Sequence, residues 1–568
     1  MNKPILTRGG YALPGTSSAF KTGDWRVRRP VYQHVNAPCH GACPAGEDPQ
    51  AYIAEMDAGR PQKAWEELVS VNPLPAITGR VCPHPCESGC NRREYDDAVA
   101  IHSIERYLGD EALKHGWAYP IAPPREDAPR VAVVGAGPAG LTCAYHLLRL
   151  GHRVTLFTAL GEAGGTLRLI PGYRLPASVI DAEVTRVLQT GIDFRPNHRL
   201  GRDIHLDELR SEYAAVFLGL GTQTSREWSI GGVTPKDLHV GLRVLEEWMA
   251  VGSVPETSSV AIVGGGNTAV DVSRILKRTG IPEVHIITHN ALPPTDGSKP
   301  SADVMPAVPR EIEQALEEGV IIHPHRGIHR LILRGAKVVG VEMTHMKKMP
   351  DTSGRLQRKT FQGTETVLHV DQVIPAIGQV VNHAGLEAVL NGESFLPVDA
   401  WRRIQGHANV FAGGDACSRS GGTVTAAVGD GRIAAEAIAA VLAGQELAEK
   451  SEASEITVSF DQLNTHYFEP LPRNEQAILP PSERIGEIET ESTLEPSQVS
   501  AEARRCLSCG NCMSCDNCWT LCPDSAVLRL PEGHAADSPY RFDYDYCKGC
   551  GLCANECPCG FIEMTEDL

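Results

Sequence analysis

The stretch RVAVVGAGPAGLTCAYHLLRLGHRVTLF, residues 130–157, decides the fold of this chain. An apolar strand runs into a glycine-rich turn, a helix follows, and a second apolar strand ends the stretch, which is the order of a βαβ unit. The turn has the pattern G-x-G-x-x-G and contains Gly135, Gly137, Pro138, Ala139 and Gly140. Its glycines permit a tight turn and a close backbone approach to a pyrophosphate, beside the free N–H groups of a helix N-terminus. The stretch therefore predicts a Rossmann-like nucleotide-binding lobe.

A second copy of this pattern, SVAIVGGGNTAVDVSRILKRTGIPEVHIIT, occupies residues 259–288. Its turn has the pattern G-x-G-x-x-A and contains Gly264, Gly266, Asn267, Thr268 and Ala269. The second strand leads into THN, which offers neither an acidic residue for the ribose of NAD nor an arginine for the extra phosphate of NADP. His289 is the nearest candidate for either role, or else an ordinary surface histidine. We expect NAD rather than NADP, because the 2′-phosphate of NADP needs a strong cation.

The first lobe departs from the usual ribose contact and is completed far downstream. An acidic residue usually ends the second strand of such a unit, but here Thr158 stands in its place, and a hydroxyl is a weaker ribose partner. Downstream, NVFAGGDACSRSGGTVTAAVGDGRIAA offers a strand, a Gly-Asp pair and a helix. We expect Asp415 to bind a ribityl hydroxyl, and the helix starting near Thr423 to direct N–H groups at a flavin ring. The second lobe is then inserted into the first.

Composition and charge argue against several classes of function. The chain has 568 residues, of which 42% are hydrophobic and 22% charged, as in a globular protein. Its formal net charge of −17 argues against nucleic acid as a partner, since phosphate binding needs a basic surface. No apolar run reaches the ~20 residues of a membrane span, and the start MNKPILTRGGYALPG lacks the apolar core of a secretory signal. We therefore expect a cytoplasmic protein that binds neither nucleic acid nor membrane.

The eighteen cysteines gather near the two ends of the chain, a pattern more typical of metal ligands than of disulfides in a cytoplasmic protein. The C-terminal part carries two runs of the form C-x-x-C-x-x-C-x-x-x-C-P. In such tandem runs, the fourth cysteine of each run ligates the cluster of the other run. The expected ligand sets of two 4Fe–4S clusters are Cys512, Cys515 and Cys518 with Cys557, and Cys547, Cys550 and Cys553 with Cys522.

Further motifs in a fixed order carry a resemblance to a known family. GAGPAGL, GGTLRLIPGYRLP, VGGGNTAVD, MPAVPREIEQALEEGV, PAIGQ and FAGGDA follow one another, and NPLPAITGRVCPHPCESGC precedes them. Over residues 35–445 the chain resembles the small subunit of glutamate synthase and its relatives, including the flavin half of dihydropyrimidine dehydrogenase. The resemblance implies FAD in the first lobe, NAD(P) in the second and iron–sulfur clusters in a helical N-terminal domain. It also implies that Gly165, Thr166 and Arg174 lie along the FAD, and Ala376 to Gly378 near the nicotinamide.

The same resemblance implies two clusters in the N-terminal domain. One ligand set would comprise Cys43, Cys82, Cys86 and Glu105. The alternative for the glutamate is an ordinary solvated helix charge. The other cluster would use Cys39 and Cys90, which leaves it two ligands short. In the family the missing pair stands in a stretch reading roughly E-A-x-R-C-L-x-C-G, and this chain has EARRCLSCG at residues 502–510. We hypothesise that Cys506 and Cys509 complete this cluster; alternatively a neighbouring subunit supplies the ligands, or the pair is unused.

These parts together indicate electron transfer. Nicotinamide exchanges a hydride, clusters carry single electrons, and a flavin converts between the two. With its ferredoxin module, the chain resembles NAD(P)-reacting flavoprotein subunits of larger anaerobic complexes, such as that of phenylglyoxylate dehydrogenase. We therefore expect a subunit that links NAD(H) to the clusters of catalytic partner subunits, reducing NAD with electrons from a 2-oxoacid-type oxidoreductase. No side chain is expected to act as acid or nucleophile.

The alternatives are a glutamate synthase small subunit, a stand-alone ferredoxin–NAD(P) oxidoreductase, and a scaffold subunit with degenerate sites. A disulfide reductase is rejected, because neither Cys143 nor Cys417 has a second cysteine nearby in the sequence with which to form a redox pair.

The expected fold class is α/β, with two Rossmann-like lobes between a helical iron–sulfur domain and a ferredoxin-type iron–sulfur domain. The expected boundaries are 1–129 for the N-terminal arm and helical domain, 130–245 and 369–448 for the two parts of the FAD lobe, 246–368 for the inserted NAD(P) lobe, 449–500 for a linker, and 501–568 for the ferredoxin-type domain.

Overall fold

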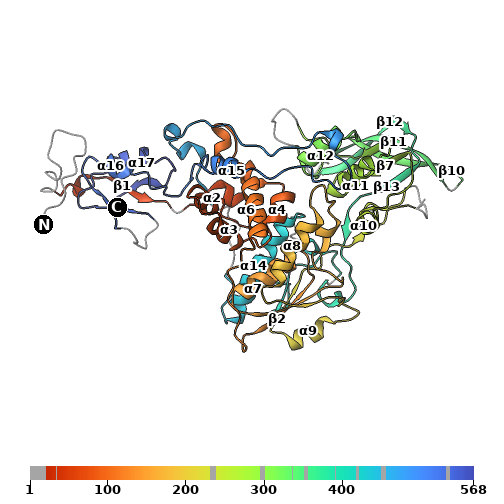
Figure 1. Cartoon of the computed structure of the whole chain (residues 1–568), viewed down its shortest axis with the longest axis horizontal. Helices are drawn as coiled ribbons and strands as arrows, with labels where there is room; N and C mark the ends of the chain where they lie inside the picture. The colour runs from red at the N-terminus through yellow and green to blue at the C-terminus, as the bar shows by residue number, and fades with distance from the viewer. Residues whose placement is uncertain are drawn as a thin grey trace.

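The computed structural model describes residues 21–33, 35–230, 238–294, 301–335, 337–350, 356–390, 392–417, 421–448, 456–531 and 538–567. Figure 1 shows a small module with both ends of the described chain at one end of the molecule, a helical domain beside it, and two larger lobes beyond. Residues 1–20 of the expected N-terminal arm and 449–455 of the expected linker lie outside the described residues.

The first lobe is built on a five-stranded parallel sheet in the order β15-β5-β2-β3-β4. Its strands are β2 (Arg130–Val134), β3 (Arg153–Phe157), β4 (Asp193–Arg195), β5 (Ala215–Leu218) and β15 (Val410–Ala412). Its helices are α7 (Pro138–Arg149), α8 (Ala177–Leu188), α9 (Leu206–Glu212), α13 (Glu387–Leu390) and α14 (Val424–Leu442). Helices α7 and α14 pack tightly because Gly431 has no side chain: a Cβ there would lie 2.3 Å from the Ala139 carbonyl oxygen.

The second lobe is inserted between β5 and β15 of the first. Its parallel sheet has the order β13-β7-β8-β9, with β7 (Ser259–Val263), β8 (Glu283–Ile287), β9 (Ile321–His323) and β13 (Gln372–Pro375). Its helices are α10 (Gly241–Val251), α11 (Asn267–Arg278) and α12 (Pro309–Glu317). The boundary expected at residue 368 differs from the structure, because β13 pairs in parallel with β7 and so still belongs to this lobe.

An antiparallel meander extends from the second lobe between β9 and β13. Its three strands are β10 (Arg326–Arg334), β11 (Lys337–Pro350) and β12 (Leu356–Leu368). After β13 the chain returns to the first lobe through a short antiparallel ribbon, in which β14 (Gln379–Val380) pairs with β6 (Thr224–Ser225).

The helical domain consists of α1 (Pro38–Ala42), α2 (Pro49–Asp57), α3 (Pro61–Val69), α4 (Pro75–Val81), α5 (Pro85–Ser88) and α6 (Ile101–His115). Its first five helices each begin with a proline, which suits the first turn because the N–H that proline lacks would have no partner there. Trp65 and Leu108 are fully buried in its core.

The C-terminal module contains both ends of the described chain. It consists of α16 (Asn517–Thr520), β16 (Val527–Arg529), β17 (Tyr540–Phe542), α17 (Leu552–Asn555) and β18 (Ile562–Glu566). Strand β1 (Arg28–Tyr32) pairs antiparallel with β18 along its whole length. Part of the expected unit 1–129, the strand Arg28–Tyr32, therefore belongs to the ferredoxin-type module.

Residues 456–503, which we call the strap, lie along the helical domain and the second lobe (Figure 1). We expected most of this acidic stretch to be a linker, but its backbone and carboxylates bind the folded domains. The N–H of Thr490 donates to the carbonyl of Tyr173 at 2.9 Å, and Arg80 Nε lies 2.8 Å from Glu489 Oε1. The strap ends in helix α15 (Pro496–Ala503), which packs on α2 and α6.

Candidate functional site

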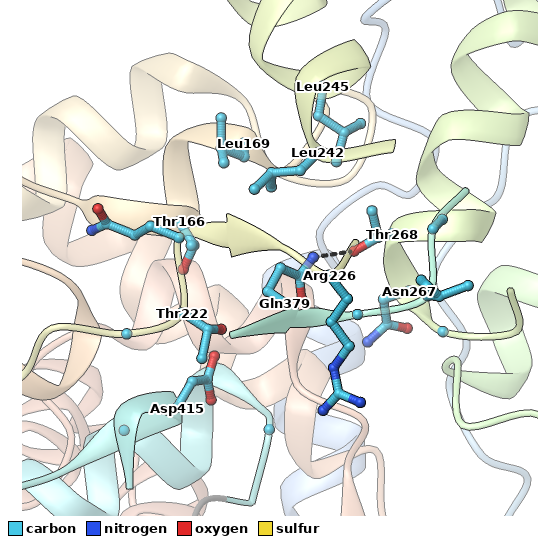
Figure 2. A pocket seen from close by; sticks show the side chains of 18 of the residues that line it. Thr166, Leu169, Thr222, Arg226, Leu242, Leu245, Asn267, Thr268, Gln379 and Asp415 are labelled. Carbon is cyan, nitrogen blue, oxygen red and sulfur yellow. Dashed lines mark hydrogen bonds between the residues drawn. The ribbon is translucent and has the colours of Figure 1, made fainter. Parts of the chain in front are cut away.

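A cavity of about 980 Å³ opens between the two lobes. Figure 2 shows Thr166 and Asp415 on its first-lobe side and Asn267 and Thr268 on its second-lobe side. All the residues predicted from the sequence to bind nucleotide line this cavity except Gly140 and Ala269, which are buried. The two predicted nucleotide sites therefore form one continuous space, in which a flavin and a nicotinamide can meet.

The turn after β2 leaves open space where a phosphate would approach. A Cβ at Gly137 would meet no atom within 4 Å. A Cβ at Gly135 would instead lie 2.2 Å from the carbonyl oxygen of Gly219, and one at Gly140 would lie 1.7 Å from that of Gly135. The first and last glycines thus permit tight packing of α7 on the sheet, and the middle one leaves the cradle open. This cradle at a helix N-terminus fits the pyrophosphate of FAD.

The predicted ribose and flavin contacts lie on the same side of the cavity. Thr158 directly follows β3, where an acidic residue is usual, and its side chain borders the cavity. Asp415 follows β15, and both Asp415 and Thr222 line the cavity. The hydroxyl of Thr423 accepts a hydrogen bond from the N–H of Ala426 at 3.1 Å and so caps α14. The N-terminus of α14 therefore borders the cavity, as the flavin hypothesis requires.

The second turn repeats the open cradle. A Cβ at Gly266 would meet no atom within 4 Å, next to the N-terminus of α11. Gln379 of the interlobe ribbon donates a hydrogen bond to the Thr268 hydroxyl at 3.3 Å (Figure 2). Ala376 and Gly378 lead from β13 into that ribbon and border the cavity. This geometry fits a dinucleotide whose pyrophosphate lies at α11.

Arg174 borders the cavity, but carboxylates of the second lobe bind its guanidinium. Its Nη1 lies 2.7 Å from Asp271 Oδ1, and its Nε lies 3.1 Å from Glu311 Oε1. All three side chains are at most 7% exposed. Although burial alone would lower it, these two carboxylates hold the pKa of Arg174 above its usual value. The ion pairs fix the two lobes to each other, so the charge of Arg174 is neutralised within the protein.

Three N-terminal cysteines face a pair of buried carboxylates. The electrostatic neighbours of Cys43 and Cys82 include Glu47 and Glu105, and those of Cys86 include Cys43 and Cys82. We call Cys43, Cys82, Cys86 and Glu105 the flavin-side set. Val81 and Pro83, on either side of Cys82, line the nucleotide cavity. This set therefore directly adjoins the predicted flavin site.

Glu105 is not a solvated helix charge. It is 5% exposed, and its Oε1 accepts hydrogen bonds from the Thr78 hydroxyl and, at 3.2 Å, from Asn72 Nδ2. Burial, and then the neighbouring Glu47, raise its pKa well above the usual value. Glu47 is 3% exposed, and burial raises its pKa to about 7. Sequence reasoning missed Glu47, since no spacing marks it; only the fold brings it to the cysteines.

A second set joins cysteines from the two ends of the chain. The electrostatic neighbours of Cys39 are Cys506, Cys90 and Cys509, together with Asp48. We call the four cysteines the strap set. Burial raises the pKa of Cys39 well above its usual value, and the three neighbouring thiols raise it further. The late pair, which follows the strap, thus lies beside Cys39 and Cys90, the two N-terminal cysteines for which two further ligands were predicted.

The C-terminal cysteines fall into two more sets. Their electrostatic neighbours group the inner ferredoxin set as Cys512, Cys515, Cys518 and Cys557, and the outer ferredoxin set as Cys522, Cys547, Cys550 and Cys553. The fourth cysteine of each run thus lies with the first three of the other run. Within the described parts of the chain, no three histidine, cysteine or carboxylate side chains are close enough to bind a single metal ion. In a cubane cluster each ligand binds its own iron, so the ligating atoms lie farther apart.

Cys559, for which the sequence indicated no role, adjoins the inner ferredoxin set. It is buried, and its Sγ lies 3.7 Å from Cys557 Sγ. A hydrogen bond from the Cys559 thiol lowers the pKa of Cys557 to about 6. The only feature of the sequence that pointed to Cys559 is its position two residues after the predicted ligand Cys557.

Family models match three parts of the chain. A model described as pyridine nucleotide-disulphide oxidoreductase matches residues 129–431, which is more than half of the chain. The chain belongs to this family. A model of dihydropyrimidine dehydrogenase domain II with its 4Fe–4S cluster matches residues 29–117, and a 4Fe–4S binding domain matches residues 540–563. The protein is thus a pyridine-nucleotide oxidoreductase of the FAD type with iron–sulfur domains at both ends.

Curated relatives agree with this architecture. The chain is 32% identical to the beta subunit of NADP(+)-dependent formate dehydrogenase from Moorella thermoacetica, over 84% of this chain and 71% of the relative. It is 35% identical to the beta subunit of NADPH-Fe(3+) oxidoreductase from Geobacter sulfurreducens, over 64% of this chain but only 54% of that relative. It is 31% identical to the small chain of NADPH-dependent glutamate synthase from Escherichia coli, over 71% and 88%. The resemblance to glutamate synthase small subunits is therefore confirmed.

The family name refers to a redox disulfide, and the cavity of this oxidoreductase offers none among its described lining residues. Cys143 and Cys417 are buried in two different hydrophobic cores, where burial raises the pKa of each thiol above its usual value.

Among the helices of the described segments, none combines the length and the apolar character that crossing a bilayer requires.

Proposed function

We propose that this oxidoreductase is a subunit that passes electrons between NAD(P)H and the iron–sulfur centres of a partner enzyme, through FAD and four 4Fe–4S clusters of its own. The flavin-side, strap, inner ferredoxin and outer ferredoxin sets would each ligate one cluster. Thiolate sulfurs bind iron in such clusters, and buried sites with N–H donors to sulfur suit them. An example of such a donor is the N–H of Ser508, which lies 3.5 Å from Cys506 Sγ.

The observation that carries the proposal is that the sets follow one another in a single order. The flavin-side set adjoins the nucleotide cavity through Cys82. Cys39 and Cys43 stand at the two ends of α1, so this one helix links the strap set to the flavin-side set. Cys86 in α5 and Cys90, two residues after the end of α5, link the two sets in a similar way, and α5 packs on α1.

The order continues into the C-terminal module. Cys509 of the strap set and Cys512 of the inner ferredoxin set are three residues apart, so their Cα atoms are separated by at most about 10 Å. The N–H of Gly510, between them, donates to the carbonyl of Cys559 at 2.7 Å and fixes this passage. The two ferredoxin sets then exchange one cysteine each. Neighbouring clusters would therefore be close along the whole route from the flavin to the end of the molecule.

The role of the chain in catalysis is to bind and orient the reacting groups. The turns at Gly137 and Gly266 would hold the two pyrophosphates, and Asp415 and the N-terminus of α14 would hold the flavin. FAD held by these residues would supply the conversion between hydride transfer and single-electron transfer. Leu169, Leu242 and Leu245 line the cavity in Figure 2 and would exclude water from the hydride-transfer site.

The partner is proposed to dock at the ferredoxin-type module. Figure 1 shows this module at the opposite end of the molecule from the second lobe. Its Cys515 and Cys550 are exposed, and residues 506–568 contain ten acidic and three basic residues, which favours a basic partner surface. We expect the partner to be a catalytic subunit with iron–sulfur centres, of the 2-oxoacid oxidoreductase class, in a cytoplasmic complex. The three named relatives belong to formate dehydrogenase, Fe(3+) oxidoreductase and glutamate synthase.

Anaerobic titration of the purified protein with NADH and with NADPH tests the proposal. We expect the flavin absorption to bleach, and the electron paramagnetic resonance signals of reduced clusters to follow. A bleached flavin beside clusters that stay oxidised would overturn the relay. A flavin that neither nucleotide bleaches would support a scaffold instead. Mass spectrometry of the natively purified complex then identifies the partner: an amidotransferase would indicate glutamate synthesis, and isolation of the chain alone a ferredoxin–NAD(P) oxidoreductase.

A further inference from the structure

Three basic residues of the meander reach the nucleotide cavity of the second lobe. Arg326 of β10, Lys348 of β11 and Arg358 of β12 all line the cavity together with His289. The N–H of Arg326 donates to the carbonyl of Thr288 at 2.8 Å, which places the start of the meander at the carboxyl end of β8. The meander therefore borders the end of the strand that follows the second glycine-rich turn and helix.

Lys348 and Arg358 form a like-charged pair. They are direct cross-strand partners in the antiparallel register of β11 and β12, so their side chains leave the same face of the meander. Like charges directly opposite each other are unfavourable in a sheet. Among the residues that the structure describes, neither forms an ion pair with a carboxylate. An anion between them would relieve this repulsion.

The surroundings of His289 show that the positive field reaches the cavity. Burial, and then Arg358 and Lys348, lower the pKa of His289 to about 4. Asp303 is the nearby carboxylate that acts in the opposite direction, and it is engaged by the Ser301 hydroxyl at 2.6 Å. Near neutral pH His289 is therefore uncharged, and the arginine and lysine side chains provide the positive charge.

The end of the second strand of a dinucleotide-binding βαβ unit is where the adenosine ribose and its 2′ substituent lie. We propose that Lys348 and Arg358, assisted by Arg326, form a pocket for the 2′-phosphate, so that this oxidoreductase uses NADP(H) in preference to NAD(H). This inference rests on the proposed function and names its nucleotide. The sequence THN suggested NAD, because no cation follows His289 directly. The proposed pocket reverses this preference, because its cations come from strands that begin 37 or more residues after His289.

Binding of nucleotide fragments tests the pocket without any turnover. The probes are 2′,5′-ADP and 5′-AMP, which differ by the 2′-phosphate, and calorimetry measures their affinity for the flavin-loaded protein. We expect 2′,5′-ADP to bind more tightly, and Lys348→Ala and Arg358→Ala each to weaken it by about tenfold to a hundredfold, as for hydrogen bonds to a charged group. The affinity for 5′-AMP should stay unchanged in both variants.

The meander provides a matched control. Lys347 and Lys359 are also direct cross-strand partners, on the opposite face of the same two strands, and neither lines the cavity. Lys359→Ala should therefore leave the preference for 2′,5′-ADP intact. Equal affinity for the two probes in the unaltered protein would overturn the inference, as would an equal loss of 2′,5′-ADP affinity in Lys359→Ala.

Failure of this inference is distinguishable from failure of the proposed function. If NADH bleaches the flavin and reduces the clusters at least as well as NADPH, the relay stands and the phosphate pocket is wrong. If neither nucleotide bleaches the flavin although 2′,5′-ADP binds as expected, the pocket stands and the relay fails. Bleaching by NADPH at concentrations where NADH is ineffective, lost in Arg358→Ala, supports both.

Discussion

The Nδ2 of Asn91 lies 3.4 Å from the Sγ of Cys509, although 418 positions separate the two residues in the sequence. Asn91 directly follows Cys90, so its side chain connects the two halves of the strap set. The side chain of Gln50 adds a second connection, because its Nε2 donates to the carbonyl of Cys509 at 2.8 Å. Two helical-domain side chains thus bind Cys509 of the late pair, which lies beside Cys90 and Cys39 as the hypothesis of one shared cluster requires.

Iron content tests this cluster. Four clusters correspond to about sixteen irons per FAD, and Cys506→Ser should reduce this to about twelve, because a cluster with one ligand removed is lost. Arg504→Ala is the control: its exposed side chain is beside the pair, but it is no ligand. Combining Cys506→Ser with Cys512→Ser should leave about eight irons, since the two changes affect different sets. Full iron content in Cys506→Ser would show that the pair is unused.

The two glycine positions of the first turn predict different defects. Gly137 has a φ of −83° and open space at its Cβ position, so Gly137→Ala should fold normally but bind FAD poorly, because a methyl group would occupy the phosphate cradle. Gly140→Ala should instead destabilise the lobe by about 1–3 kcal/mol or more, because α7 could no longer pack on the turn. Flavin content and urea unfolding separate the two effects. A Gly137→Ala variant with full flavin content would contradict the cradle.

The sequence predicted those parts of the site that depend on local patterns. Both glycine-rich turns that line the cavity could be recognised in the sequence, because each βαβ unit has its own sequence pattern within about 30 residues. The exchange of Cys522 and Cys557 between the two ferredoxin sets follows from the motif itself. The pairing of Cys506 with Cys39 could be proposed only because a displaced motif was recognisable.

The remaining features depend on contacts that no local pattern reveals. The strap was expected to be a linker because it is acidic, and acidic residues favour solvent unless cations pair with them. Here Arg80 and Arg310, which belong to other domains, form ion pairs with strap carboxylates. Glu47 joins the flavin-side set only through folding of the helical domain. Lys348 and Arg358 lie on a meander whose face toward the cavity is set by strand register, which the sequence does not specify.

The ion pairs of Arg174 should stabilise the junction of the two lobes. Arg174→Met leaves Asp271 and Glu311 buried without this partner, which typically costs about 3–5 kcal/mol. Arg168→Met is the control, since Arg168 pairs with the exposed Asp181 at 2.9 Å and such surface pairs contribute at most about 1 kcal/mol. Urea unfolding measures both. Partial recovery in Arg174→Met combined with Asp271→Leu would support a charge effect, whereas equal midpoints for Arg174→Met and Arg168→Met would contradict it.

The thiol of Cys559 should tune the cluster of the inner ferredoxin set without binding iron. Hydrogen bonds to ligating sulfurs stabilise the reduced, more negative cluster and so raise its potential. A bond of about 0.5–1.5 kcal/mol corresponds to about 20–60 mV for one electron. Cys559→Ala should therefore lower one cluster potential by this amount in a redox titration, with iron content unchanged, and Cys143→Ala should shift none. A loss of about four irons in Cys559→Ala would instead identify Cys559 as a ligand, and an unchanged potential would show that its contact with Cys557 has no influence on the cluster.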